Sequence, residues 1–139
     1  MILLDASGLF AALDEDEPAH EPARAALEGD PGPFVLSPFV LAELDYLLLR
    51  ELGVEFELSV LQEIARGGYT LAPFDEAAVG EAANIARRYE DLRIGLADAS
   101  LVVLAGRYRT SRVLTLDERH FRALRTPAGE LFVVLPADA

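Results

Sequence analysis

The chain of 139 residues is long enough for one compact domain, and its 52% hydrophobic content can form a single core, which excludes a disordered chain despite 26% charged residues. It has no cysteine, which excludes disulfides and thiolate metal sites, and with only His20 and His120 any metal is expected to have oxygen ligands. The formal net charge of −12 argues against a protein that coats nucleic acid.

The N-terminal half of the sequence alternates short apolar runs with helical segments. Asp5 closes the first apolar run, and either Asp5 or Ser7 can cap the helix that follows. Pro38 suits the first turn of a later helix, and Gly53 ends that helix. These signals predict strands at residues 1–4 and 34–37 and helices at residues 6–13, 18–28, 38–52 and 54–66.

The C-terminal half continues this alternation. It predicts strands at residues 69–72, 112–115 and 131–135 and helices at residues 75–89, 96–107 and 117–124. Alternating strands and helices indicate an α/β fold, with a parallel sheet of about five strands between helical layers, in a single domain over residues 1–139. No secretion leader and no membrane-spanning stretch is visible, so we expect a cytoplasmic protein without membrane contact.

Basic residues are unevenly distributed. All twelve are arginines, and nine of them lie between Arg87 and Arg125, where only five acids occur and the local balance is +4. Such a segment can hold a phosphate backbone on an otherwise acidic protein, although the same arginines also suit a solvated helix surface. The candidates for RNA contact are Arg87, Arg88, Arg93 and Arg119, with Arg107, Arg109, Arg112, Arg122 and Arg125 as further possibilities.

Four acidic residues lie next to or within apolar segments, where an acidic side chain must have a structural or functional reason. Asp5 and Asp117 follow predicted strands, and Asp98 begins an apolar helix; each of the three also suits a helix cap or first turn. Glu43 lies on an apolar helix face, where a carboxylate needs a cation, a partner or a local opening. Asp45, on the same helix, points elsewhere and is interpreted as a salt-bridge or surface residue, with an accessory role at the site as the alternative.

Together these acids indicate a metal site. Ligands bind beyond the carboxyl ends of the strands in open parallel sheets, where Asp5 and Asp117 are expected. Converging carboxylates repel each other unless a divalent cation neutralises them, and oxygen ligands select Mg²⁺ or Mn²⁺. Such ions promote phosphodiester hydrolysis. Nucleotide-binding loops and the nucleophile elbow of hydrolases have no counterpart in the sequence.

Four short motifs carry a family resemblance. Asp5-Ala-Ser-Gly-Leu-Phe-Ala, Leu-Ala-Glu43-Leu-Asp-Tyr, Leu-Ala-Asp98-Ala-Ser-Leu-Val and Leu-Thr-Leu-Asp117-Glu-Arg-His-Phe resemble, in order and spacing, the motifs of PIN domains. Each motif is short, but all four in order over a chain of this length are specific. The length and the first motif resemble VapC-type toxins of bacterial toxin–antitoxin pairs more than eukaryotic PIN nucleases.

The resemblance implies a PIN-like fold and a set of functional residues. Asp5, Glu43, Asp98 and Asp117 would form a catalytic pocket that binds Mg²⁺ or Mn²⁺, and Ser7 and Thr115 would be accessory hydroxyls. His120 receives no role. The resemblance also implies an endoribonuclease that acts on structured or translation-related RNA, forms a homodimer and is silenced by a VapB-type antitoxin.

Two other functions remain open at this stage. The chain could be a PIN-like module that binds RNA or protein without cleavage, or a nuclease of RNA processing or DNA without a toxin role. The presence of all four acids favours an enzyme. A homodimer is also expected on physical grounds, because the helices predicted at residues 38–52 and 54–66 carry more apolar residues than one buried stripe needs.

Overall fold

The computed structural model describes residues 1–139 and contains one five-stranded sheet. Every neighbouring pair of strands is parallel, and the strand order is β3-β2-β1-β4-β5. The strands are β1 (Ile2–Leu4), β2 (Phe34–Leu36), β3 (Thr70–Leu71), β4 (Arg112–Leu114) and β5 (Val133–Leu135). The predicted parallel α/β fold is confirmed.

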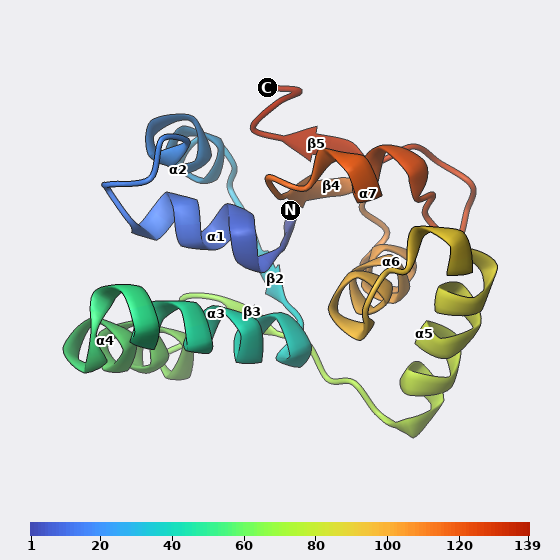
Figure 1. Ribbon diagram of the computed structural model, residues 1–139, viewed down its shortest axis with the longest axis horizontal. Helices are drawn as coiled ribbons and strands as arrows, with labels where there is room; N and C mark the ends of the chain where they lie inside the picture. The colour runs from blue at the N-terminus through green and yellow to red at the C-terminus, as the bar shows by residue number, and fades with distance from the viewer.

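Helices cover both faces of this sheet and make a three-layer molecule. In Figure 1, α1 to α4 lie on one side of the sheet, and α5 and α6 lie on the other. None of the helices could span a membrane. The helical segments are α1 (Ala6–Leu13), α2 (His20–Glu28), α3 (Pro38–Leu52), α4 (Val54–Ala65), α5 (Glu76–Arg88), the short 3₁₀ helix η1 (Glu90–Leu92), α6 (Leu96–Tyr108) and α7 (Glu118–Ala123).

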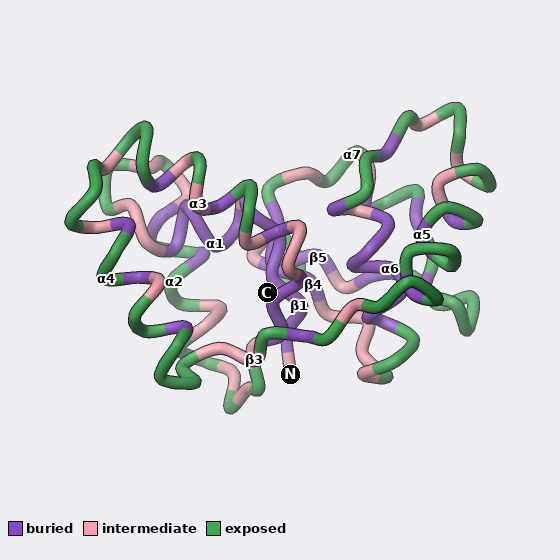
Figure 2. The backbone as a smooth tube through the Cα atoms, turned by 90° about the horizontal axis from the view of Figure 1, so that it is seen from below, coloured by how far each residue is buried: buried purple, intermediate pink, exposed green.

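The core forms around the central strands. All three residues of β1 are fully buried, because helices cover both faces of a parallel sheet and leave no polar face. Figure 2 shows this pattern as a buried centre with exposed outer helix surfaces. The chain leaves β1 toward β2 on one side, and β4 lies on the other, so the strand order reverses between β1 and β4. This switch point is the expected ligand-binding edge.

Local signals explain why the helices begin where they do. The Asp5 side chain accepts a hydrogen bond from the Ala6 amide and caps α1, as predicted. Ser37 caps α3 and Pro38 occupies its first turn, while Gly53 adopts a φ of 87° at the junction between α3 and α4. Helix α3 therefore starts at residues that suit a first turn, and it ends at a glycine whose positive φ other residues rarely adopt.

Two boundaries predicted from the sequence need correction, and one short helix is additional. Helix α2 begins at His20 rather than at Pro18, because the His20 amide first closes a turn onto the Glu17 carbonyl. The last strand begins at Val133, since Leu131 pairs with Arg125 in an isolated antiparallel bridge. The 3₁₀ helix η1 was not predicted.

Candidate metal centre at the carboxyl edge of the sheet

Asp5 lies at the carboxyl end of β1 and is almost entirely buried, with 6% of its surface exposed. Its Oδ1 accepts the Ala6 amide at 2.9 Å, and its Oδ2 accepts the Thr115 hydroxyl at 2.6 Å and the Ser7 hydroxyl at 3.3 Å. These donors hold the carboxylate at a fixed place on the edge of the sheet. Both hydroxyls that the family resemblance indicated therefore contact Asp5.

Thr115 connects the ends of the two strands at the switch point. Its Oγ1 donates to Asp5 and also accepts the Asp117 amide at 2.9 Å. The Ser7 hydroxyl accepts the Leu116 amide at 3.0 Å, so it joins the start of α1 to the loop that follows β4. Asp5 and Asp117 are consequently tied to each other through short hydrogen bonds rather than through the sheet alone.

Asp98 and Asp117 meet at His120. The Nδ1 atom of His120 lies 2.9 Å from Asp98 Oδ2 and 3.0 Å from Asp117 Oδ2. Asp117 also caps α7 by accepting the His120 amide at 3.1 Å. The three residues can each offer one ligand atom within 4.8 Å of the others. Sequence reasoning missed His120, although its position three residues after Asp117 on a helix places both side chains on one face.

Glu43 reaches the cluster from α3. Its side chain is exposed, so the apolar face on which it was predicted opens to solvent at this point. A buried contact between the Ser37 and Ser100 hydroxyls, 2.7 Å apart, fixes the start of α3 against α6, which carries Asp98. Because Ser100 donates its proton to the Ala97 carbonyl, Ser37 is the donor in this pair. Sequence reasoning did not identify this pair of serines.

Electrostatics show that the acids share one environment. Burial and repulsion from Asp98 and Glu43 raise the pKa of Asp5 to about 6, against the lowering effect of its hydrogen bonds. Burial and then Asp98 raise the pKa of Glu43, and burial is also the largest cause of the raised pKa of Asp98, which Asp117 raises further. The pKa values of Asp5, Glu43 and Asp98 are therefore each raised by at least one other acid of the group.

The donor set fits a divalent cation. None of the four acids pairs with an arginine, and His120 is the one basic group that contacts any of them. The neighbouring carboxylates repel one another, and carboxylate oxygens are the ligands that Mg²⁺ and Mn²⁺ prefer. A proton on Asp5 and a cation among the acids are two ways of relieving the same repulsion.

The arginines of the C-terminal half divide into two groups. Arg107, Arg112 and Arg122 form ion pairs with acids of this chain, and Arg125 donates to backbone carbonyls. The other five arginines are exposed and form no ion pair within the chain; they are Arg109 and the four predicted first for RNA contact, Arg87, Arg88, Arg93 and Arg119.

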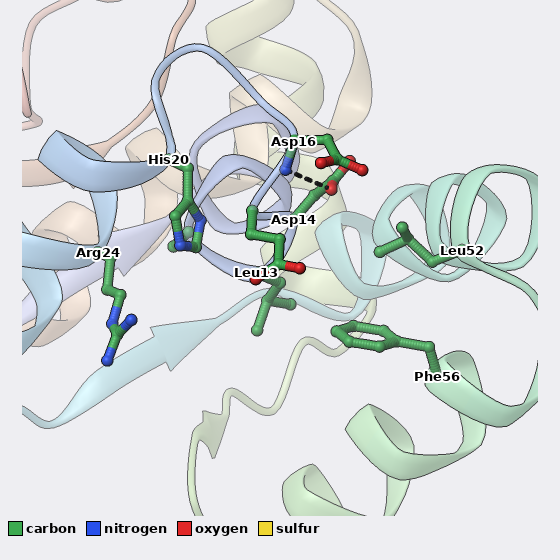
Figure 3. Close-up of a pocket in the computed structure, with 9 residues that line it drawn as sticks. Leu13, Asp14, Asp16, His20, Arg24, Leu52 and Phe56 are labelled. Carbon is green, nitrogen blue, oxygen red and sulfur yellow. Dashed lines mark hydrogen bonds between the residues drawn. The ribbon is translucent and has the colours of Figure 1, made fainter.

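A separate hollow of about 500 Å³ lies between the loop after α1 and the junction of α3 with α4 (Figure 3). Leu13, Leu52 and Phe56 form its apolar side, and Asp14 and Asp16 lie beside it, with the Asp16 amide donating to Asp14. None of the four clustered acids lines this hollow, so cavity size does not mark the metal centre.

Asp45 does not form a salt bridge, and its interpretation as a salt-bridge or surface residue is wrong. It is half-buried on α3, where it contacts Glu57 of α4, and its Oδ1 is buried without a hydrogen-bond donor. Glu57 is only 8% exposed, and its contact with Asp45, together with burial, raises its pKa above the ordinary 4.5. A proton on Glu57 would therefore relieve the contact between these two carboxyl groups by donating to Asp45.

This acid pair predicts how stability depends on pH. The raised pKa of Glu57 means that the fold holds this proton more tightly than the unfolded chain does, so the stabilisation is present below pH 4.5 and is lost as the pH rises through the raised pKa. Glu57→Gln keeps a neutral donor toward Asp45 at every pH. We expect its melting temperature to exceed that of the wild type by a margin that grows between pH 4 and pH 8.

The matched control is Glu55→Gln, which removes an exposed carboxylate from the same first turn of α4. Both variants lose a similar interaction with the helix dipole, so the difference between them reports the acid pair and the burial of Glu57. Melting curves of Glu57→Gln and the wild type that remain parallel over this pH range would contradict the shared proton.

Comparison with known proteins identifies the family. The PIN domain family matches residues 2–126 of this chain. Ribonuclease VapC26 from Mycobacterium tuberculosis is 47% identical over 135 residues, which cover 97% of this chain and all of that protein. The chain belongs to the PIN-domain family, and within it to the VapC group.

Solved structures share the fold. The structure of Mycobacterium tuberculosis VapC20, a toxin that cleaves the sarcin-ricin loop, aligns with a TM-score of 0.77 at 17% identity and covers 84% of this chain and 90% of that one. The DNA-bound VapBC structure from Salmonella typhimurium aligns with a TM-score of 0.69 at 21% identity and covers 96% and 98%. At these identities the likeness establishes the architecture alone.

Proposed function

We propose that this protein is a metal-dependent endoribonuclease and the toxin of a toxin–antitoxin pair. The observation that carries the proposal is the cluster of Asp5, Glu43, Asp98 and Asp117 at the switch point of the sheet, without an arginine to neutralise it. The similarity to ribonuclease VapC26 over almost the whole chain supports the same activity.

The four carboxylates are the residues that would hold Mg²⁺ or Mn²⁺. When bound, the ion activates a water molecule and stabilises the negative charge that develops on the phosphodiester. Thr115 and Ser7 orient the Asp5 carboxylate toward the cluster, and the Ser37–Ser100 contact fixes α3 against α6. The protein thus contributes a preorganised set of oxygen ligands.

Incubation with a structured RNA and with a DNA of the same sequence tests this proposal. We expect internal cleavage of the RNA in the presence of Mn²⁺ or Mg²⁺ and no cleavage of the DNA. Cleavage of the DNA alone would favour a DNA-processing nuclease. Binding of the RNA without cleavage, in the presence of either ion, would favour a non-catalytic PIN module.

RNA contact is expected at the unpaired arginines. Arg119 lies two residues beyond Asp117 and is exposed, so a charge reversal there repels phosphate close to the cluster. We expect Arg119→Glu to weaken RNA binding about tenfold at low salt. We also expect a weaker dependence of affinity on salt, because fewer counterions are released on binding when a phosphate contact is lost. Filter binding over a series of salt concentrations measures both effects.

Arg66→Glu provides the control for this experiment, because Arg66 is exposed on the opposite helical layer, at the end of α4, and the change of charge is identical. Equal losses of affinity in the two variants would indicate a general effect of net charge. An RNA affinity that does not respond to salt in the wild type would remove the proposed backbone contacts.

A homodimer is supported by apolar surface on α3 and α4. Tyr46 is 62% exposed and Leu49, Val54 and Leu58 are each at least 45% exposed, although α3 already buries Val40, Leu44 and Leu48 in the core. Such a surface on a small domain usually marks an interface, and two-fold symmetry is the common way to cover it.

The double variant Tyr46→Asp, Leu49→Asp tests the dimer. We expect light scattering to give about twice the chain mass of 15.1 kDa for the wild type and the single-chain mass for the variant. Leu131→Asp, which places one such charge at an exposed leucine away from α3 and α4, should leave the mass unchanged. A wild-type protein that is monomeric at high concentration would contradict the proposal.

An antitoxin is the proposed inhibitor. Two hollows adjoin the cluster, one lined by Glu43 and Tyr46 and the other by Ser7 and Arg50, and both include Leu47 of α3. They form a concave path along α3 into which an antitoxin tail could extend, with an arginine that takes the place of the metal. The proposal requires a small protein, encoded beside this chain, that binds it and suppresses RNA cleavage.

A further inference from the structure

His120 is the one side-chain nitrogen at the acidic cluster. We propose that its Nδ1 is a direct ligand of the bound ion and that the site consequently prefers Mn²⁺ to Mg²⁺. The inference rests on the metal site of the proposed function and adds to the four carboxylates a donor of different chemistry.

The distances between these atoms match those between adjacent metal ligands. In an octahedral site with bonds of about 2.1 Å, neighbouring ligand atoms lie about 3.0 Å apart. His120 Nδ1 lies 2.9 Å from Asp98 Oδ2 and 3.0 Å from Asp117 Oδ2. One ligand atom from each of the three residues lies within 4.8 Å of the others, which accommodates a single ion in contact with all three.

The backbone aims this nitrogen at the carboxylates. Asp117 caps α7 through the His120 amide, so the first turn of the helix fixes the imidazole beside the cap. The other ring nitrogen, Nε2, makes no hydrogen bond within the protein. The side chain of His120 is 20% exposed, so an ion from solvent can reach Nδ1. The ligand atoms of His120, Asp98 and Asp117 are therefore close enough to share one ion.

A nitrogen ligand changes which ion the site selects. Both ions prefer oxygen ligands, but Mg²⁺ binds oxygen almost exclusively and retains its water molecules, whereas Mn²⁺ as a transition-metal ion tolerates one imidazole nitrogen among them better. A site of carboxylates alone would discriminate little between Mg²⁺ and Mn²⁺. The His120 ligand is therefore expected to account for most of the preference for Mn²⁺.

Electron paramagnetic resonance of Mn²⁺ bound to the full chain tests the proposal without reference to activity. We expect electron spin-echo modulation from a directly bound imidazole nitrogen in the wild type and its loss in His120→Gln. The variant retains His20, which lies in α2 and whose Nδ1 contacts the Ala11 carbonyl, so the lost signal belongs to His120. We also expect the Mn²⁺ affinity to fall about tenfold or more, with a smaller change for Mg²⁺.

Several outcomes would overturn the proposal. Bound Mn²⁺ without nitrogen modulation in the wild type would mean that Nδ1–H only hydrogen-bonds to the carboxylates, and modulation that persists in His120→Gln would assign the nitrogen elsewhere. An absence of Mn²⁺ binding would remove both the ligand and the metal site. Metal-dependent RNA cleavage without the nitrogen signal would leave the proposed function standing, whereas the nitrogen signal without cleavage would remove the function alone.

Discussion

Asp98→Asn is expected to reduce RNA cleavage at least about 100-fold while the fold remains intact, because the substitution keeps the shape of the side chain and removes a charge that the ion needs. Asp98 lies between Glu43, Asp117 and His120, so its loss affects the whole cluster. Asp5→Asn should behave in the same way. The rate of RNA cleavage at saturating Mn²⁺ measures the effect.

The melting temperature of Asp98→Asn shows whether activity is lost because a metal ligand is missing or because the protein is unfolded. Burial raises the pKa of Asp98, so its ionised form destabilises the metal-free protein above that pKa, and the neutral asparagine removes this cost. We therefore expect metal-free Asp98→Asn to melt at or above the temperature of the wild type at pH 8. Asp16→Asn, an exposed acid outside the cluster, should retain full activity. An Asp98→Asn protein that still cleaves RNA at the wild-type rate would refute the assigned site.

Gly8→Ala is expected to cause the largest loss of stability. A Cβ at this position of α1 would lie 2.8 Å from the Thr115 amide nitrogen and closer still to the carbonyl of Leu114, and backbone atoms cannot move aside as a flexible side chain can. Overpacking of this kind costs about 3 kcal/mol. For a chain of this length that corresponds to a melting temperature lower by roughly 10 °C.

The same substitution at Gly80 is the matched control. Gly80 lies exposed within α5, and an added Cβ there would contact nothing within 4 Å. Alanine favours the helix over glycine by about 1 kcal/mol, so Gly80→Ala should raise the melting temperature by a few degrees. Thermal unfolding of both variants measures these changes. A Gly8→Ala protein with the melting temperature of the wild type would show that α1 does not pack against the end of β4 as described.

Much of the fold follows from local sequence signals. Helices α1 and α3 have the predicted boundaries because Asp5 and the Ser37-Pro38 pair are strong start signals and each helix is apolar enough to be buried. The strand order could not be predicted in this way, since strands of two or three residues carry no information about their neighbours. The start of α2 was also missed, because Pro18 suits a turn as well as a first helical residue.

In the candidate site, too, some residues could be predicted from local sequence and others depend on how the helices pack. Asp5 and Asp117 were predictable, because acids that follow strands of a parallel sheet share one edge. Asp45 and Glu43 lie two residues apart on one helix, and only the position of α4 shows that Asp45 faces Glu57. His120 and the Ser37–Ser100 pair depend on the packing of α7 and α6, which connects residues 22 and 63 positions apart in the sequence.

Cleavage of a labelled structured RNA before and after removal of divalent ions tests the central claim most directly. The protein would be treated with EDTA, dialysed, assayed, and assayed again after addition of Mn²⁺ or Mg²⁺, with Asp98→Asn beside it. We predict no cleavage by the stripped wild type, full recovery with added ion, and no recovery by the variant. Equal cleavage with EDTA and with added ion would contradict a metal-dependent ribonuclease built on these four carboxylates.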